Sequence, residues 1–153
     1  MKKFPVTVIA AAASLMFSAT AFSETMSKDA YKAAENQIEA TYKSEKALCE
    51  PLSGNAEDVC VAQAKAKEKT AKADLEARYD PTEKNHYKAR IAKAEADYDV
   101  AKEKCDDLSG NEKDVCVKEA KAAETKAKAD AEVAKESTKG AEKAAEAKQD
   151  AAA

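Results

Sequence analysis

The chain has 153 residues, of which 37 are alanine and 36% are charged, and its formal net charge is −3. Large apolar side chains are rare after the N-terminal segment, because Leu, Ile, Val and Phe together supply only about a tenth of the sequence from position 24 onward. Burial of such side chains must offset the chain entropy lost on folding, so this composition argues against a deep enzyme cleft. It argues equally against a Rossmann domain, a β-sandwich and a transmembrane bundle.

Residues 1–23 have the pattern of a secretory signal peptide. Two lysines precede an apolar stretch over residues 4–17, and small residues follow it. We expect cleavage after Ser23, with Ala21 as the alternative, because the apolar stretch is too short for a comfortable membrane span. Cleavage leaves 24 basic and 29 acidic residues, a net charge of −5. The mature chain is therefore expected in the periplasm or released from the cell, without nucleic acid or membrane insertion.

The chain contains an internal repeat, in which the sequence of residues 31–80 recurs at residues 87–136. The two segments are identical at 25 of 50 aligned positions. The matches include tyrosines, cysteines and a Leu-Ser-Gly-Asn segment, which a shared bias toward alanine and lysine does not produce. The repeat predicts two equivalent units, at residues 24–80 and 81–137, followed by a flexible tail at 138–153.

Each unit is predicted to be a helical hairpin, because alanine, lysine and glutamate are strong helix formers. The expected fold is therefore all-α: two tandem disulfide-stapled hairpins in an elongated or loose four-helix arrangement. The expected helices cover residues 27–52, 56–79, 82–108 and 112–137.

The turn of each hairpin is marked by a Gly-Asn pair. Gly54 and Gly110 suit the left-handed position that follows the end of a helix. Asn55 and Asn111 come next and suit the N-cap of the following helix.

A third break, at residues 80–83, separates the two units. Asp80 is the expected N-cap and Pro81 the expected first residue of the next helix. The flanking helices can fold back into a bundle or continue as a rod kinked at Pro81. We expect weak packing between the hairpins and an elongated molecule, because the hairpin seams use most of the large apolar residues. The main spare ones are Val59, Val61, Val115 and Val117.

A seven-residue apolar spacing predicts the buried face of each unit. Alanines dominate the partner helices and allow close approach. A helix-spaced tyrosine stripe is more typical of a core than of a binding surface, although both interpretations remain open. The predicted seam residues are Tyr31, Ile38, Tyr42, Tyr87, Ile91, Tyr98 and Leu108.

The four cysteines are predicted to form two local disulfides. Cys49 and Cys60 are equidistant from the first turn, and Cys105 and Cys116 are equidistant from the second. Each bond would contribute roughly 3 kcal/mol on the chain-entropy model. An oxidising compartment favours the bonded state. The ten-residue gap within each pair does not match the spacing of a structural zinc site, and a Cys-x-x-Cys redox motif is absent.

Other chemistry has little support in the sequence. His86 is the only histidine, and the three glycines are too far apart for a phosphate-binding loop. We therefore predict no catalytic residues, no metal ligands and no cofactor.

Residues 49–61, 105–117 and 64–76 resemble segments of small secreted Ala/Lys-rich proteins of proteobacteria, described as hypothetical or TolA-like cell-envelope proteins. The likeness to TolA itself is compositional and confined to its helical stalk. The run at 64–70 is also similar to late-embryogenesis-abundant stress proteins.

The expected function is that of a non-enzymatic periplasmic helical repeat protein, a structural or protein-interaction module of the cell envelope. Its expected partner is another envelope protein or a second copy of itself. Two alternatives remain: a hydrophilic stress-protective protein, and a thiol-based redox or metal sensor.

Overall fold

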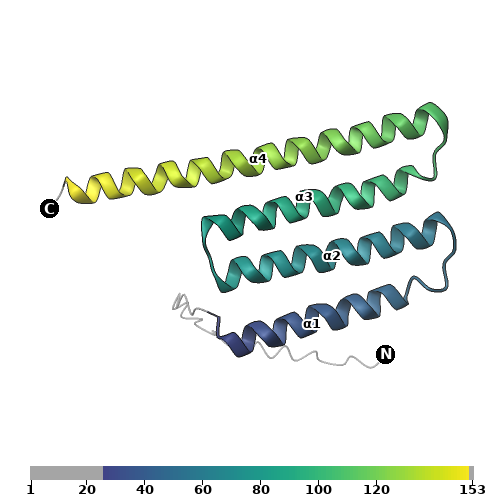
Figure 1. The fold of residues 1–153 in the computed structure, drawn as a ribbon, viewed down its shortest axis with the longest axis horizontal. Coiled ribbons are helices and arrows are strands. Elements are labelled where there is room, and N and C mark those ends of the chain that lie inside the picture. The colour runs from purple at the N-terminus through teal and green to yellow at the C-terminus, as the bar shows by residue number, and fades with distance from the viewer. Residues whose placement is uncertain (1–25, 152–153) are drawn as a thin grey trace, which may run out of the picture.

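A computed structural model describes residues 26–151, which form four antiparallel helices (Figure 1). They are α1 (Lys28–Ala47), α2 (Asn55–Tyr79), α3 (Glu83–Cys105) and α4 (Gly110–Asp150). The all-α prediction is confirmed. The expected signal peptide, residues 1–23, lies outside the described residues.

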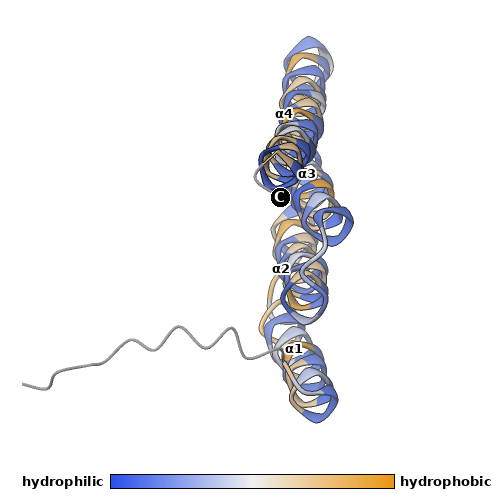
Figure 2. Cartoon of the chain, turned by 90° about the vertical axis from the view of Figure 1, so that its left-hand side faces the viewer, coloured by the Kyte–Doolittle hydropathy of each residue, from blue (hydrophilic) through white to orange (hydrophobic). Residues whose placement is uncertain are grey.

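The four helices stand side by side in one layer, in chain order. Figure 2 shows this layer edge on, with a thickness of one helix. Each helix packs only against its neighbours in the chain: α1 on α2, α2 on α3 and α3 on α4. The arrangement is therefore neither a closed four-helix bundle nor a rod continued through Pro81. Every helix keeps both layer faces free of other described helices.

The prediction of weak packing between the hairpins is wrong, because α2 packs against α3 more extensively than against α1. The interface is built from alanines on the sides of α2 and α3 that point away from the hairpin seams. Small side chains let two helix backbones approach closely, so dispersion contacts accumulate without large apolar groups. The alanines, none more than 8% exposed, are Ala62, Ala77, Ala89 and Ala96.

Two helices end earlier than predicted. α1 stops at Ala47, because Pro51 lacks an amide hydrogen and disfavours helix at the residue before it. α3 stops at Cys105, where two aspartates follow and oppose the helix dipole. Leu108 consequently lies in the turn with 39% of its surface exposed, and its predicted place in the seam is wrong.

Both hairpin turns use a glycine in the left-handed region, with φ of 59° at Gly54 and 55° at Gly110. The predicted N-caps are wrong by one or two residues. Gly54 itself is the N-cap of α2, so Asn55 is the first helical residue. Ser109 is the N-cap of α4, which places Asn111 second in that helix. The positive φ turns the chain directly into the helix, which leaves no separate capping position after the glycine.

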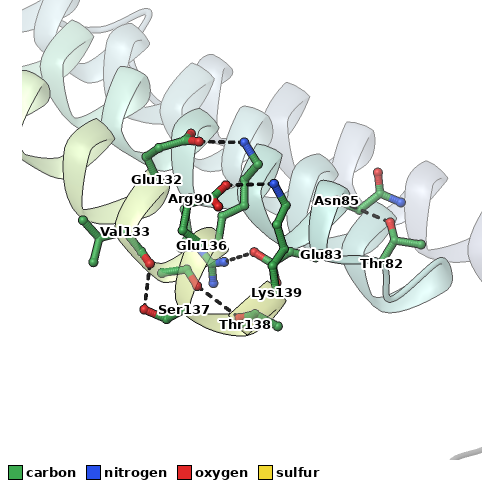
Figure 3. A network of polar contacts seen from close by, with 12 residues as sticks. Thr82, Glu83, Asn85, Arg90, Glu132, Val133, Glu136, Ser137, Thr138 and Lys139 are labelled. Carbon is green, nitrogen blue, oxygen red and sulfur yellow. Dashed lines mark hydrogen bonds and ion pairs between the residues drawn. The ribbon is translucent and has the colours of Figure 1, made fainter. Parts of the chain in front are cut away.

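The link between the hairpins covers residues 80–82, one residue more than the expected helices leave between them. Asp80 caps the C-terminus of α2, and Thr82 is the N-cap of α3, so the N-cap role predicted for Asp80 is wrong. Pro81 lies between them and is not helical. The side chain of Asn85 donates to the Asp80 carbonyl oxygen at 2.9 Å and to its Oδ2 at 2.8 Å. These bonds fold α3 back along α2. The backbone N–H of Asn85 donates to the Thr82 hydroxyl oxygen (Figure 3).

The segment predicted to be a flexible tail is helical, because α4 continues to Asp150. Gly140 is the weakest helix former in this segment, and a glycine costs about 1 kcal/mol relative to alanine. The alanines, lysines and glutamates around it are strong helix formers and outweigh that cost. The end of α4 therefore projects beyond α3, as Figure 1 shows.

Candidate functional surface

Each hairpin is closed by a disulfide next to its turn, as predicted. Cys49 is bonded to Cys60 and Cys105 to Cys116, with Cα–Cα distances of 5.6 and 5.7 Å. Cys49 and Cys105 are at most 1% exposed, and no cysteine of residues 26–151 is free. The two disulfides therefore have a structural role, since they hold together the helices that form the surface.

The tyrosine seam lies half-buried between the helices of each hairpin, and not in a sealed core. The rings of Tyr31 and Tyr79 are 4.6 Å apart, and the Tyr31 hydroxyl donates to Glu76 at 3.0 Å. This hydrogen bond raises the pKa of Tyr31. In the second hairpin, lysine ammonium groups of α4 lie over the rings of Tyr87 and Tyr98, at 4.5 and 4.9 Å. Ile38, Tyr42 and Ile91 are half-buried in the same seams.

The described helices bury few complete side chains. Leu75, Cys49 and Cys105 are the largest that are fully buried, and alanines supply most of the rest. The half-buried tyrosine rings span the gap between the two helices of a hairpin. Almost all polar and charged side chains of such a layer lie at its surface.

A repeated ion-pair network joins the helices. Lys72 lies 3.5 Å from Glu39 and 2.9 Å from Glu68. At the equivalent positions of the second repeat, Lys128 lies 3.0 Å from Glu95 and 2.9 Å from Glu124. The internal repeat therefore preserves one lysine bridging two helices in each hairpin.

Glu95 extends this network to a third helix, because Lys69 of α2 also contacts it at 2.8 Å. Hydrogen bonds from Lys69 and Lys128 lower the pKa of Glu95. Bonds from Lys121 and Lys128 likewise lower the pKa of Glu124, whose side chain is 5% exposed. The pairs of Glu124 lie within α4, whereas the two pairs of Glu95 connect α3 to α2 and to α4.

The two hairpins carry equivalent grooves of about 240 and 230 Å³. Tyr42 and Ala64 line the first groove, and Tyr98 and Ala120, their repeat equivalents, line the second. A wider groove of about 660 Å³ lies beside the first and shares Ile38 with it. The grooves are shallow channels between neighbouring helices.

The wider groove holds a cluster that sequence reasoning missed. Its lining includes His86 and both arginines of the chain, Arg78 and Arg90, together with Lys93. Arg90 pairs with Glu83 at 2.8 Å (Figure 3), and Lys93 pairs with Asp97. The residues come from two helices, α2 and α3. They lie close together because the α2–α3 link folds the chain back on itself, which the sequence does not show.

Across residues 26–151 the structure shows no group of three or more His, Cys, Asp or Glu residues placed to hold a metal ion. None of the four described helices has an apolar stretch long enough to cross a membrane. No protein-family model, curated protein or solved structure matches this chain.

Proposed function

We propose that this chain is a non-enzymatic helical repeat protein that acts as a structural or protein-interaction module of the cell envelope. The single-layer arrangement is the observation that carries the proposal. Among residues 26–151, a one-helix layer leaves both faces and both edges free of other helices, and repeat proteins use such extended surfaces to bind other proteins. The TolA-like resemblance and the signal-peptide pattern support the periplasm as the proposed site of action.

The disulfides support an exported location, because such bonds persist in oxidising compartments and are rare in the cytosol. The same bonds weigh against the thiol-sensor alternative, since one sulfur of each pair belongs to a cysteine that is almost completely buried. The stress-protective alternative draws on composition alone. A chain held by two disulfides and by ion pairs between its helices is more ordered than a stress-protective protein needs to be.

The test is a crosslinking pull-down from the envelope fraction of the source cells, followed by reconstitution with purified components. We expect one stoichiometric complex, made with another envelope protein or with a second copy of the chain. The control is the fully reduced and alkylated protein, in which the staples are absent. A chain that forms no stoichiometric complex, yet protects unrelated enzymes from drying, would contradict the proposal and favour the stress-protective alternative.

A further inference from the structure

The interface between α2 and α3 joins repeat one to repeat two. The repeat equivalents of its two sides lie at the two edges of the layer, where no described helix covers them. Within the chain, the second helix of repeat one, α2, packs against the first helix of repeat two, α3. The repeat equivalent of α2 is α4, and the repeat equivalent of α3 is α1. We call the side of α4 that faces away from α3 its outer side, and this side corresponds to the side of α2 that contacts α3. The outer side of α1, which faces away from α2, corresponds to the side of α3 that contacts α2.

The outer side of α1 keeps the alanines of the internal interface. Ala89 and Ala96 of α3 are 8% and 1% exposed, and α2 covers them. Their equivalents in the first repeat are Ala33 and Ala40, which are exposed. The identity of these residues is retained although no described helix covers them.

The outer side of α4 keeps apolar residues at most of the positions that α2 turns toward α3. Ala77 of α2 is 3% exposed, whereas its equivalent Val133 is 66% exposed. Figure 3 shows Val133 on the side of α4 turned away from α3. Val115, the equivalent of Val59, is 43% exposed, and Ala122 and Ala129 lie between the two valines. This stripe therefore has two large apolar groups in water where repeat one has a covered surface.

We propose that copies of this chain join edge to edge, with the outer side of α4 of one copy packed against the outer side of α1 of the next. The contact repeats the antiparallel α2–α3 interface between molecules. The inference rests on the proposed function of an interaction module and names its partner as a second copy. Because the two surfaces differ, the contact is head to tail and extends the layer into an open series.

The charges at this contact differ from those of the internal interface. Ala62 and Asp99 line the same groove between α2 and α3. Their equivalents are Lys118 and Lys43, so two like charges meet at one end of the contact between copies. Like charges at an exposed contact repel, and salt screens that repulsion. Edge-to-edge association should therefore strengthen when the salt concentration rises from about 50 mM to about 300 mM.

The direct test uses a short bismaleimide to crosslink variants that each carry one added free cysteine beside the two native disulfides. Ala77 and Ala89 line one groove within the chain, so their equivalents, Val133 and Ala33, should meet between copies. A mixture of Val133→Cys and Ala33→Cys proteins should give a covalent dimer that neither variant gives alone. The double variant Ala77→Cys/Ala89→Cys, which should crosslink internally, calibrates the reach of the reagent.

The matched control is Ala141→Cys, an exposed position on α4 two turns beyond Val133. Mixed with Ala33→Cys, it should give no dimer above background. Dimers formed by Val133→Cys alone would show an α4-to-α4 contact and overturn the proposal. Absence of the mixed dimer at any accessible protein concentration would also overturn it.

Sedimentation velocity on the purified protein supplies a second readout. Val133→Glu should weaken association on the order of tenfold and leave the thermal unfolding curve unchanged, because the side chain is exposed. Lys43→Asp, which restores the residue that α3 carries, should strengthen association. A chain that stays monomeric but forms a stoichiometric complex with another envelope protein would defeat this inference and leave the proposed function standing.

Discussion

Removal of one disulfide should lower the free energy of unfolding by more than the loss of any single surface ion pair. Both bonds join cysteines with a sequence separation of 11, so both close loops of the same size. On the chain-entropy model each bond contributes roughly 3 kcal/mol to the free energy of unfolding. An exposed ion pair contributes only about 0.2–1 kcal/mol, so the staples dominate over any single bridge of the network.

The perturbation is a pair of alanine substitutions, Cys49→Ala/Cys60→Ala or Cys105→Ala/Cys116→Ala. Alanine is preferred to serine because Cys49 and Cys105 are at most 1% exposed, and a buried hydroxyl would add its own cost. Each double variant should lose about 3 kcal/mol, with a fall in melting temperature on the order of 10 °C. The two losses should be nearly equal.

The assay is urea denaturation under non-reducing conditions, followed by circular dichroism. Helix content at low temperature should remain high, because it comes from local propensity. Hydrogen exchange should show faster opening of α1 in the first variant, since α1 has no buried residue and packs on α2 alone. A loss below about 1 kcal/mol in both variants would refute the argument that the staples offset the thin core.

Three further substitutions test individual contacts. Leu75→Ala removes a side chain that is 1% exposed and should cost about 2–3 kcal/mol in urea denaturation. Asn85→Ala breaks two bonds at the α2–α3 link and should cost about 1–3 kcal/mol, whereas the exposed control Asn36→Ala should be neutral. The lowered pKa of Glu95 means that its ionised form stabilises the fold above the unfolded pKa, near 4.3, and that this stabilisation is lost as the pH falls through the folded value. Wild-type stability should therefore drop between about pH 5 and 3, and Glu95→Gln should reduce that slope; an unchanged slope would exclude this role.

The parts of the fold that depend on local signals could be predicted from the sequence. Helix propensity is local, and it predicts most of the extent of the four helices correctly. The symmetry of each cysteine pair about its turn depends only on spacing, and it predicts both disulfides. Helix ends are harder to predict, because at positions such as Asn55 and Asp80 adjacent residues compete for the same cap.

The single layer could not be predicted, because its main interface is made of alanine. In the sequence, Ala89 and Ala96 indicate only a helix. They are buried because α2 lies alongside α3, and at a rise of about 1.5 Å per residue α2 is about 30 to 40 Å long. Counting large apolar residues therefore underestimates the contact between the hairpins. Alanine on two opposite sides of a helix is the signal that such a count misses.

The candidate surface is hidden for the same reason. Arg78, His86 and Arg90 lie in one groove only because the link at residues 80–82 folds the chain back on itself. In the sequence the same three residues are compatible with solvated positions on separate helices. The exposure of Val133 could not be predicted from the sequence either, because it depends on the lack of a fifth helix beside α4 among the described residues.

Small-angle X-ray scattering on the chromatographically isolated monomer tests the single-layer structure most directly. A compact domain of this size would have a radius of gyration of about 14 Å. Four helices laid side by side, with α4 roughly 60 Å long and spacings of about 10 Å, give a radius of gyration of about 18 Å and a maximum dimension above about 60 Å. Those values, together with a thickness of one helix, are the result we predict. A radius of gyration of about 14 Å with a globular distance distribution would contradict the layer and the extended interaction surface that depends on it.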